Sequence, residues 1–207
     1  MYEEIERPII DIGKKMEDQG ILLDKKYLEN LSKEYHKELD KLTKEIYKMA
    51  GAEFNINSPK QLSEILFNKM GMKSKKKTTG GSMSTNVAVL EELSEENPII
   101  KQILEYRELQ KLLSTYVDVL PKMTKEDGRL HARFIQNGTT TGRFSSSDPN
   151  LQNLPIKSEL GKRIRGGFVA PSGYKLLALD YSQIELRVAA ILSGDKKMTD
   201  IFKEGKD

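Results

Sequence analysis

The chain has 207 residues and a formal net charge of +3, with 37% hydrophobic and 31% charged residues. This length allows one or two domains with a hydrophobic core. The absence of cysteine excludes disulfides and thiolate metal sites, and it is compatible with a reducing cytosol. No apolar run is long enough to predict a membrane span, and the N-terminal residues lack the profile of a signal peptide.

Positive charge is concentrated in two parts of the chain. Residues 58–81 contain six lysines and one glutamate, and residues 129–165 contain seven lysines or arginines with one aspartate and one glutamate. Because the whole chain is nearly neutral, two basic segments indicate contact with a polyanion more than general solubility. A lysine run is also common in a solvated loop, so charge alone leaves both interpretations open.

Apolar residues recur at helical spacing in three segments of the N-terminal half. The first covers residues 5–16. Asp24 can cap a long second helix that ends at Gly51, and another long helix begins at Asn97. Both long helices carry apolar stripes with steps of three and four, so we expect them to pack side by side in antiparallel fashion. The stripe residues are Leu28, Leu31, Tyr35, Leu39, Leu42, Ile46 and Met49 in one helix, and Ile99, Ile103, Tyr106, Leu113, Val117 and Leu120 in the other.

Between the two long helices the sequence predicts a small helical tip. Ser58 and Gln61 form the pattern of a capping box for a helix over residues 59–70. A loop rich in lysine, hydroxyl groups and glycine follows at residues 73–85, and a short helix at residues 86–93 closes the tip. The free N–H groups of a helix N-terminus in the same tip favour anion binding.

The C-terminal half has shorter elements and predicts part of a β-sheet. Extended segments are expected at residues 130–136 and 139–144, with a loop at 145–155. Residues 176–179 form an apolar run of the length of a buried strand. The elements together predict an α+β fold, in which a long antiparallel helix pair joins part of an antiparallel sheet.

The most informative stretch is KLLALDYSQIELR, residues 175–187. Its apolar run ends at Asp180, whose carboxylate at a strand tip could bind a hard cation such as Mg²⁺. Ser182 and Glu185 form the pattern of a capping box for the following helix. An aspartate at a strand end can equally be a turn residue, and the glutamate can belong only to the cap. The spacing by itself therefore leaves both interpretations open.

DYSQIELR closely resembles the first palm motif of the family A DNA polymerases, the bacterial DNA polymerase I group. TTTGRFSSSDPNLQNLP, at residues 139–155, resembles a second block of that family. The resemblance continues in the family's order through NINSPKQL, KKTTGGSMST, ILEYRELQKLLSTY and EGKD, and it covers essentially the whole chain. It implies a palm-base helix at residues 1–22, a thumb subdomain at 23–120 and the N-terminal part of the palm at 121–207.

The resemblance also implies a role in template-directed nucleotidyl transfer. Asp180 would be the catalytic, metal-binding aspartate, and the backbone carbonyl of Tyr181 would be a second ligand of Mg²⁺. That two-metal site would be only half supplied by this chain. Glu185 would exclude the 2′-OH of a ribonucleotide, and Gln183 and Ile184 would line the same dNTP pocket.

Primer–template DNA is the implied macromolecular partner, bound through phosphates and minor-groove acceptors that are nearly independent of sequence. In the tip, the contacts would come from Ser58, Lys60, Lys75, Lys76, Lys77 and Thr78. Near the primer end, they would come from Arg143, Asn150, Gln152 and Asn153. Asn and Gln at such positions can instead stabilise turns. A role on DNA predicts a cytoplasmic, nucleoid-associated location and no membrane partner.

The sequence departs from the family in ways that limit these expectations. Leu113 and Ile135 stand where the family has a lysine and a polar residue, so duplex contacts are in doubt there. The fingers and the rest of the palm do not appear, and we expect the chain to be inactive without that portion, in cis or as a separate fragment. The alternative is a non-catalytic duplex-DNA-binding module derived from a polymerase thumb, which would have no use for Asp180 and Glu185 together. A third possibility, a helical-hairpin interaction protein, would leave the basic tip unexplained.

Overall fold

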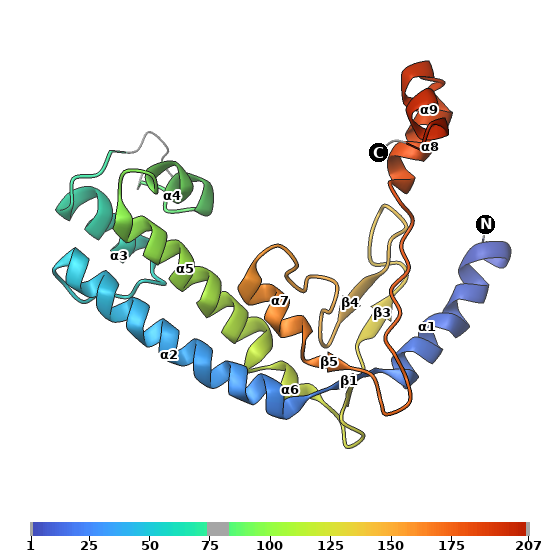
Figure 1. Ribbon diagram of the computed structural model, residues 1–207, viewed down its shortest axis with the longest axis horizontal. Helices are drawn as coiled ribbons and strands as arrows, with labels where there is room; N and C mark the ends of the chain where they lie inside the picture. Colours follow the sequence, from blue (N-terminus) through green and yellow to red (C-terminus); the bar gives the residue numbers. More distant parts are fainter. Residues whose placement is uncertain (1, 74–82, 206–207) are drawn as a thin grey trace. The chain divides into compact units, whose positions relative to one another are not determined.

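The computed structural model describes residues 2–73 and 83–205. Two compact units are present, Met1–Pro171 and Ser172–Asp207, and each is described by itself. The first unit combines helices with small antiparallel sheets, which confirms the predicted α+β fold (Figure 1). Its helical elements, with π-helical segments written η, are η1 (Tyr2–Glu6), α1 (Arg7–Gln19), α2 (Lys25–Ala50), α3 (Pro59–Ser63), η2 (Glu64–Lys69), α4 (Val87–Leu93), α5 (Pro98–Leu112), η3 (Leu113–Val117), α6 (Leu120–Met123) and α7 (Glu159–Arg165).

The long helix α2 begins and ends as local capping chemistry predicts. Asp24 accepts a hydrogen bond from the Tyr27 backbone N–H at 2.9 Å, which satisfies one of the free donors of the first turn. Gly51 ends the helix in the left-handed region, at a φ of 63°, and its N–H donates to the Tyr47 carbonyl. Glycine adopts this conformation without the strain that a Cβ would add.

Helices α2 and α5 lie side by side and run antiparallel, as predicted (Figure 1). Near the start of α2, Ser32 Oγ donates to Asp118 Oδ1 at 2.6 Å, just beyond the end of η3. Near the end of α2, Glu45 Oε2 accepts from Gln102 Nε2 at 2.8 Å, in the first turns of α5. The two bonds join the helices at opposite ends. We call α2, together with α5 and its continuation η3, the shaft.

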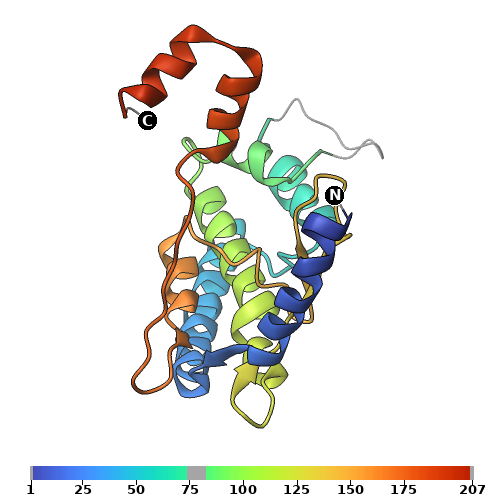
Figure 2. The same ribbon diagram turned by 90° about the vertical axis from the view of Figure 1, so that its right-hand side faces the viewer.

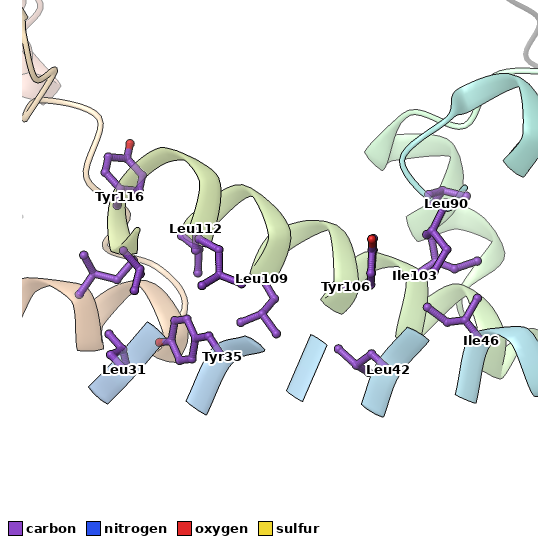
Figure 3. Packing of buried hydrophobic residues seen from close by; sticks show 14 of the residues in the cluster. Leu31, Tyr35, Leu42, Ile46, Leu90, Ile103, Tyr106, Leu109, Leu112 and Tyr116 are labelled. Carbon is purple, nitrogen blue, oxygen red and sulfur yellow. The ribbon is translucent and has the colours of Figure 1, made fainter. Parts of the chain in front are cut away.

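The apolar stripes face each other along the shaft and form the core (Figure 3). At one end Leu31 and Tyr35 of α2 lie near Leu112 and Tyr116, and at the other end Ile46 lies near Ile103. Most of the predicted stripe residues are buried. Met49 is an exception at 37% exposure, and Leu39 is only partly buried. Leu113 is 1% exposed, so it belongs to the core and is not available for duplex contact.

The tip contains the predicted helices, but the Gln61 side chain has a different hydrogen-bond partner from the one that a capping box predicts. Ser58 Oγ accepts from the Gln61 N–H at 3.4 Å and caps α3, and the chain stays helical through η2. The Gln61 side chain does not complete a capping box, because its Oε1 accepts from the Asn55 N–H at 2.7 Å instead. The Ser58 N–H already donates to the Asn55 carbonyl, which leaves the glutamine without that donor. Asn86 caps α4, which ends at Leu93 as predicted.

The sheets are short, and one predicted strand lies elsewhere. Strands β1 (Ile21–Leu23), β2 (Arg129–Leu130) and β5 (Phe168–Val169) form an antiparallel sheet of order β2-β1-β5. The strand β3 (Arg133–Ile135) pairs with β4 (Ser145–Ser147), whereas the sequence predicts a short strand or extended segment at 139–144 and a loop from 145. Residues 136–144 turn back instead, with Gly142 at a φ of 75°, a conformation that strands do not adopt.

The second unit contains α8 (Ile184–Ser193) and α9 (Lys196–Lys203). The predicted strand over residues 176–179 is wrong, because this segment is extended but pairs with no strand among the described residues. Leu177 and Leu179 are 82% and 87% exposed, so the apolar run is not buried either. None of the helices in the described part of the chain has both the length and the apolar character that crossing a bilayer requires.

Candidate functional site

Asp180 lies on the turn that leads from the exposed apolar run into α8. Both Asp180 and Tyr181 are exposed, and Gln183 adopts the left-handed region with a φ of 50° just before the helix begins. The N-cap residue of α8 is Gln183, not the predicted Ser182, and the Gln183 side chain makes no capping hydrogen bond. The Ser182 carbonyl accepts a hydrogen bond from Arg187 Nε at 2.9 Å. The expected sharp turn is present, and Arg187 helps to stabilise it.

The oxygen donors of this turn are those that a hard cation prefers. The carboxylate of Asp180 and the backbone carbonyl of Tyr181 belong to adjacent residues on an exposed turn. Among residues 2–73 and 83–205, this turn included, no group of three His, Asp or Glu side chains is placed to hold a metal ion. The donors therefore fit part of a magnesium site, with the other ligands still to be supplied.

Three predicted nucleotide-binding residues lie in one turn. Gln183 precedes α8, and Ile184 and Glu185 occupy its first turn, all of them exposed. The helix is fixed to α9, because the Arg187 guanidinium lies over the Phe202 ring at 4.7 Å from the centroid. Arg187 thus joins the turn to the helix pair, a role that the sequence did not indicate.

The amide side chains predicted to contact the primer end also stabilise a turn. Asn150 Oδ1 accepts from the Gln152 backbone N–H at 3.1 Å and from Ser146 Oγ at 3.2 Å. Gln152 Nε2 donates to the Phe144 carbonyl at 2.9 Å. Asn150, Gln152 and Asn153 are all exposed, so Asn150 and Gln152 keep a surface for a partner while their side chains hold the turn. We call residues 150–153 the amide turn.

Arg143 lies on the loop between β3 and β4, in the same unit as the amide turn. Its side chain is exposed, and its backbone carbonyl accepts from Thr139 Oγ1 at 2.8 Å. Ile135, where the family has a polar residue, is a half-buried residue of β3. The loop therefore offers a cation close to the start of β4, whereas the Ile135 position offers no polar group.

The tip residues are only partly described. Lys60 is exposed on the first turn of α3, beside the cap that Ser58 supplies. Lys75, Lys76, Lys77 and Thr78 lie outside the described residues.

The chain following the lysine-rich segment is fixed to the shaft by Arg107 of α5. Its guanidinium donates to the Thr85 carbonyl at 2.5 Å, and Thr85 itself is buried. Burial lowers the pKa of Arg107 from its usual value, although the group stays charged at neutral pH. Ser63 Oγ adds a hydrogen bond to the Met83 carbonyl at 3.2 Å. Neither anchor could be predicted from the sequence, because both acceptors are backbone groups.

Helix α7 is fixed to α2, beside which it lies (Figure 2). Arg163 forms an ion pair with Glu34 and lies over the Tyr35 ring, at 5.5 Å from the centroid. The hydrogen bond from Arg163 to Glu34 raises the pKa of the guanidinium further above neutrality. Arg163 of α7 therefore fixes this helix to α2 through Glu34 and Tyr35.

A family model described as DNA polymerase family A matches residues 25–207 of this sequence. The chain belongs to DNA polymerase family A. It is 51% identical to the thermostable DNA polymerase I of Thermus aquaticus and 48% identical to DNA polymerase I of Lactococcus lactis, with all of this chain aligned in both. It covers 25% and 24% of those proteins, so the chain spans about a quarter of the length of the family A relatives it matches.

A solved family A structure has the same fold as this chain. It is described as the POL domain of Pol1 from M. smegmatis in complex with DNA primer-template and dNTP. The match has a TM-score of 0.90 at 38% identity, and it covers 99% of this chain and 36% of that one. The predicted family is therefore confirmed by sequence and by fold.

Proposed function

We propose that this chain is the thumb and the first part of the palm of a DNA polymerase I, and that it binds primer–template DNA. The observation that carries the proposal is the match of almost the whole chain to a polymerase domain in complex with DNA primer-template and dNTP. The two basic segments of the sequence are consistent with a phosphate-binding surface. The tip would bind duplex phosphates, and Arg143 with the amide turn would bind close to the primer end.

The amide turn suits a contact that must tolerate every base pair. Asn150 and Gln152 each use part of their side chain to hold the turn, and the turn leaves their outer surfaces exposed. Minor-groove acceptors are similar for A·T and T·A pairs, so amide donors there grip a pair without identifying it. A polymerase needs this kind of contact, because it must extend any correctly paired end.

Asp180 and Tyr181 would hold Mg²⁺ through a carboxylate and a backbone carbonyl. Bound Mg²⁺ supplies stabilisation of the charge that develops on the attacking and leaving oxygens of phosphoryl transfer. The chain contributes the position of these two oxygens, on the turn that Arg187 stabilises. The remaining ligands and the triphosphate-binding residues would come from a fingers and palm portion, in cis or as a separate fragment.

Glu185 would select the sugar of the incoming dNTP. Its place in the first turn of α8, five residues after Asp180, puts it on the helix that follows the metal-binding turn directly. A glutamate side chain at this position would occupy the space that the 2′-OH of a ribonucleotide would need. Gln183 and Ile184, on the same exposed turn, would line the pocket beside it.

The DNA-binding role is tested by the salt dependence of affinity. Changing Lys75, Lys76 and Lys77 to Gln should weaken binding to primer–template DNA of any sequence. It should also flatten the plot of log K against log salt by roughly one unit for each phosphate that the tip no longer neutralises. The control is a second triple Lys-to-Gln variant, at the exposed α2 positions Lys37, Lys44 and Lys48, which removes the same charge from the shaft.

The two triple variants separate local phosphate binding from net charge. The proposal predicts a flatter slope for the tip variant and a slope close to the parent's for the shaft variant. Equal slopes in all three proteins would contradict the role of the tip. Equally weakened binding in both variants would mean that only total charge matters.

A further inference from the structure

Three buried or half-buried tyrosines of the shaft donate their hydroxyl groups to backbone carbonyls of one distant segment, residues 153–163. The bonds are Tyr116 to Asn153 at 2.5 Å, Tyr35 to Leu160 at 2.7 Å and Tyr27 to Arg163 at 2.8 Å. Figure 3 shows Tyr35 and Tyr116 at the same end of the shaft. A buried hydroxyl needs a partner, so each bond also fixes the backbone that accepts it.

The Tyr116 bond is distinct because its acceptor is the last residue of the amide turn. Tyr116 is 6% exposed within η3, and burial raises the pKa of its hydroxyl above the usual value, so it is a neutral donor at physiological pH. The amide turn itself is closed by the two hydrogen bonds that Asn150 accepts. A closed turn behaves as one body, and the Tyr116 hydroxyl is a polar contact that joins it to the shaft.

Packing alone leaves the amide turn less well fixed. Leu151 and Leu154, on either side of the exposed residues Gln152 and Asn153, are only partly buried against the core. Apolar contacts have no preferred direction, so they set the distance of the turn from the shaft but not its orientation. A hydrogen bond to the Asn153 carbonyl is directional and adds that constraint.

We propose that Tyr116 is a positioning residue for the DNA contact near the primer end, and that its hydroxyl orients the amide turn so that Asn153 reaches the duplex. The inference rests on the proposed DNA-binding function. Tyr116 touches no DNA in this account and acts only through the turn. Its loss should therefore change binding at a primer end more than binding to duplex in general.

The experiment measures the dissociation constants of the 207-residue chain for a primer–template junction and for an uninterrupted duplex of equal length. The ratio of the two constants reports the preference for the junction. Tyr116→Phe should reduce this preference about fivefold, the effect of one net hydrogen bond. The control is Tyr47→Phe, which removes a similar bond, 2.8 Å long, from Tyr47 to the Phe54 carbonyl at the other end of α2. The control should leave the ratio unchanged.

Two further measurements separate positioning from a loss of stability. In an Asn153→Ala background, Tyr116→Phe should have no additional effect on the ratio, because the side chain that it positions is absent. Replacing Tyr116 by 4-aminophenylalanine, which restores a donor at the same place, should restore the preference. A variant that was merely less stable would change the ratio equally in the parent and in the Asn153→Ala background, so the double variant is the measurement that separates the two explanations.

The outcomes distinguish the two proposals. If Asn153→Ala leaves the junction preference unchanged, the contact of the amide turn with DNA is wrong, and the role of Tyr116 falls with it. If Asn153→Ala reduces the preference while Tyr116→Phe does not, the DNA contact stands and the positioning role is refuted. Equal and additive effects of the two substitutions would also refute positioning.

Discussion

Replacing Tyr35 by Phe would test how strongly α7 is fixed to the shaft. Tyr35 is 2% exposed, and its hydroxyl donates to the Leu160 carbonyl at 2.7 Å. Burial raises the pKa of Tyr35 from 10.0 to about 12, against the opposing effect of the nearby Arg163 guanidinium. The substitution keeps the ring under Arg163 and removes only the hydroxyl and its titration.

The expected change in the free energy of unfolding depends on pH. At pH 7 the variant should be less stable by about 1 kcal/mol, because one net hydrogen bond between Tyr35 and the Leu160 carbonyl is removed. The folded pKa lies above the unfolded one, so the parent keeps its full stability below about pH 10 and loses it as the pH rises toward about 12. At about pH 11 the Tyr35 hydroxyl is mostly ionised in the unfolded parent but mostly neutral in the folded parent. This difference should lower the parent's free energy of unfolding by roughly 1.4 kcal/mol, which cancels its stability advantage over the variant.

The assay is urea unfolding of both proteins, followed by circular dichroism at about pH 7, 9 and 11. Subtracting the two free energies removes the titration of every other group, because both proteins share them. Tyr174→Phe serves as the control, since Tyr174 is 76% exposed and its loss should change stability by less than about 0.5 kcal/mol at each pH. If the difference in the free energy of unfolding between the parent and Tyr35→Phe stayed constant over this pH range, the inference that the Tyr35 hydroxyl is buried and neutral would be refuted.

Three further predictions concern the proposed polymerase site. Arg143→Ala should weaken binding to a primer–template junction more than to uninterrupted duplex, and an equal loss on both in a filter-binding assay would count against its place near the primer end. In a polymerase reconstituted with a fingers and palm fragment, Glu185→Ala should raise the incorporation of rNTP relative to dNTP, whereas an unchanged ratio in single-nucleotide extension would leave Glu185 without a role in sugar selection. The 207-residue chain alone should extend no primer with dNTP and Mg²⁺, because Asp180 is the single carboxylate that we propose as a metal ligand. Activity restored by the added fragment should vanish on Asp180→Ala while DNA binding persists, and robust extension by the chain alone would overturn this account.

The helices could be predicted from the sequence because their ends depend on nearby residues. Asp24 and Gly51 define α2 through hydrogen bonds to groups three or four residues away. Asn86 acts in the same way at α4, and Asp195 at α9. The antiparallel shaft followed from the apolar stripes, since two such stripes bury each other best when the helices lie alongside.

The strands could not be predicted as well, because a strand needs a partner that its own sequence does not identify. Residues 176–179 have the composition of a buried strand but pair with no described strand, so they stay extended and exposed. The serine-rich β4 has little strand propensity, yet it pairs with β3 in a regular register. The helix α8 begins one residue later than predicted, with Gln183 as its N-cap, because the backbone turns at Gln183 in the left-handed region.

Adjacency in the sequence was enough to predict the grouping of Asp180, Gln183 and Glu185 on one turn. The contacts that hold the amide turn and α7 could not be found in this way, because the tyrosine donors and their acceptors are 37 to 136 residues apart. The acceptors are also backbone carbonyls, which carry no signal in the sequence. The same limit applies to Arg107, whose buried partner is the carbonyl of Thr85.

The use of backbone acceptors has a consequence for how this region tolerates mutation. Substituting Asn153, Leu160 or Arg163 leaves the carbonyl in place, so the tyrosine bonds survive changes in the side chains of the segment they hold. The constraint falls instead on the donors, where even the loss of one oxygen atom removes a bond. Residues 153–163 can therefore be redesigned at their exposed positions, to test the proposed contact with DNA, without loss of the hydrogen bonds that fix the segment to the shaft.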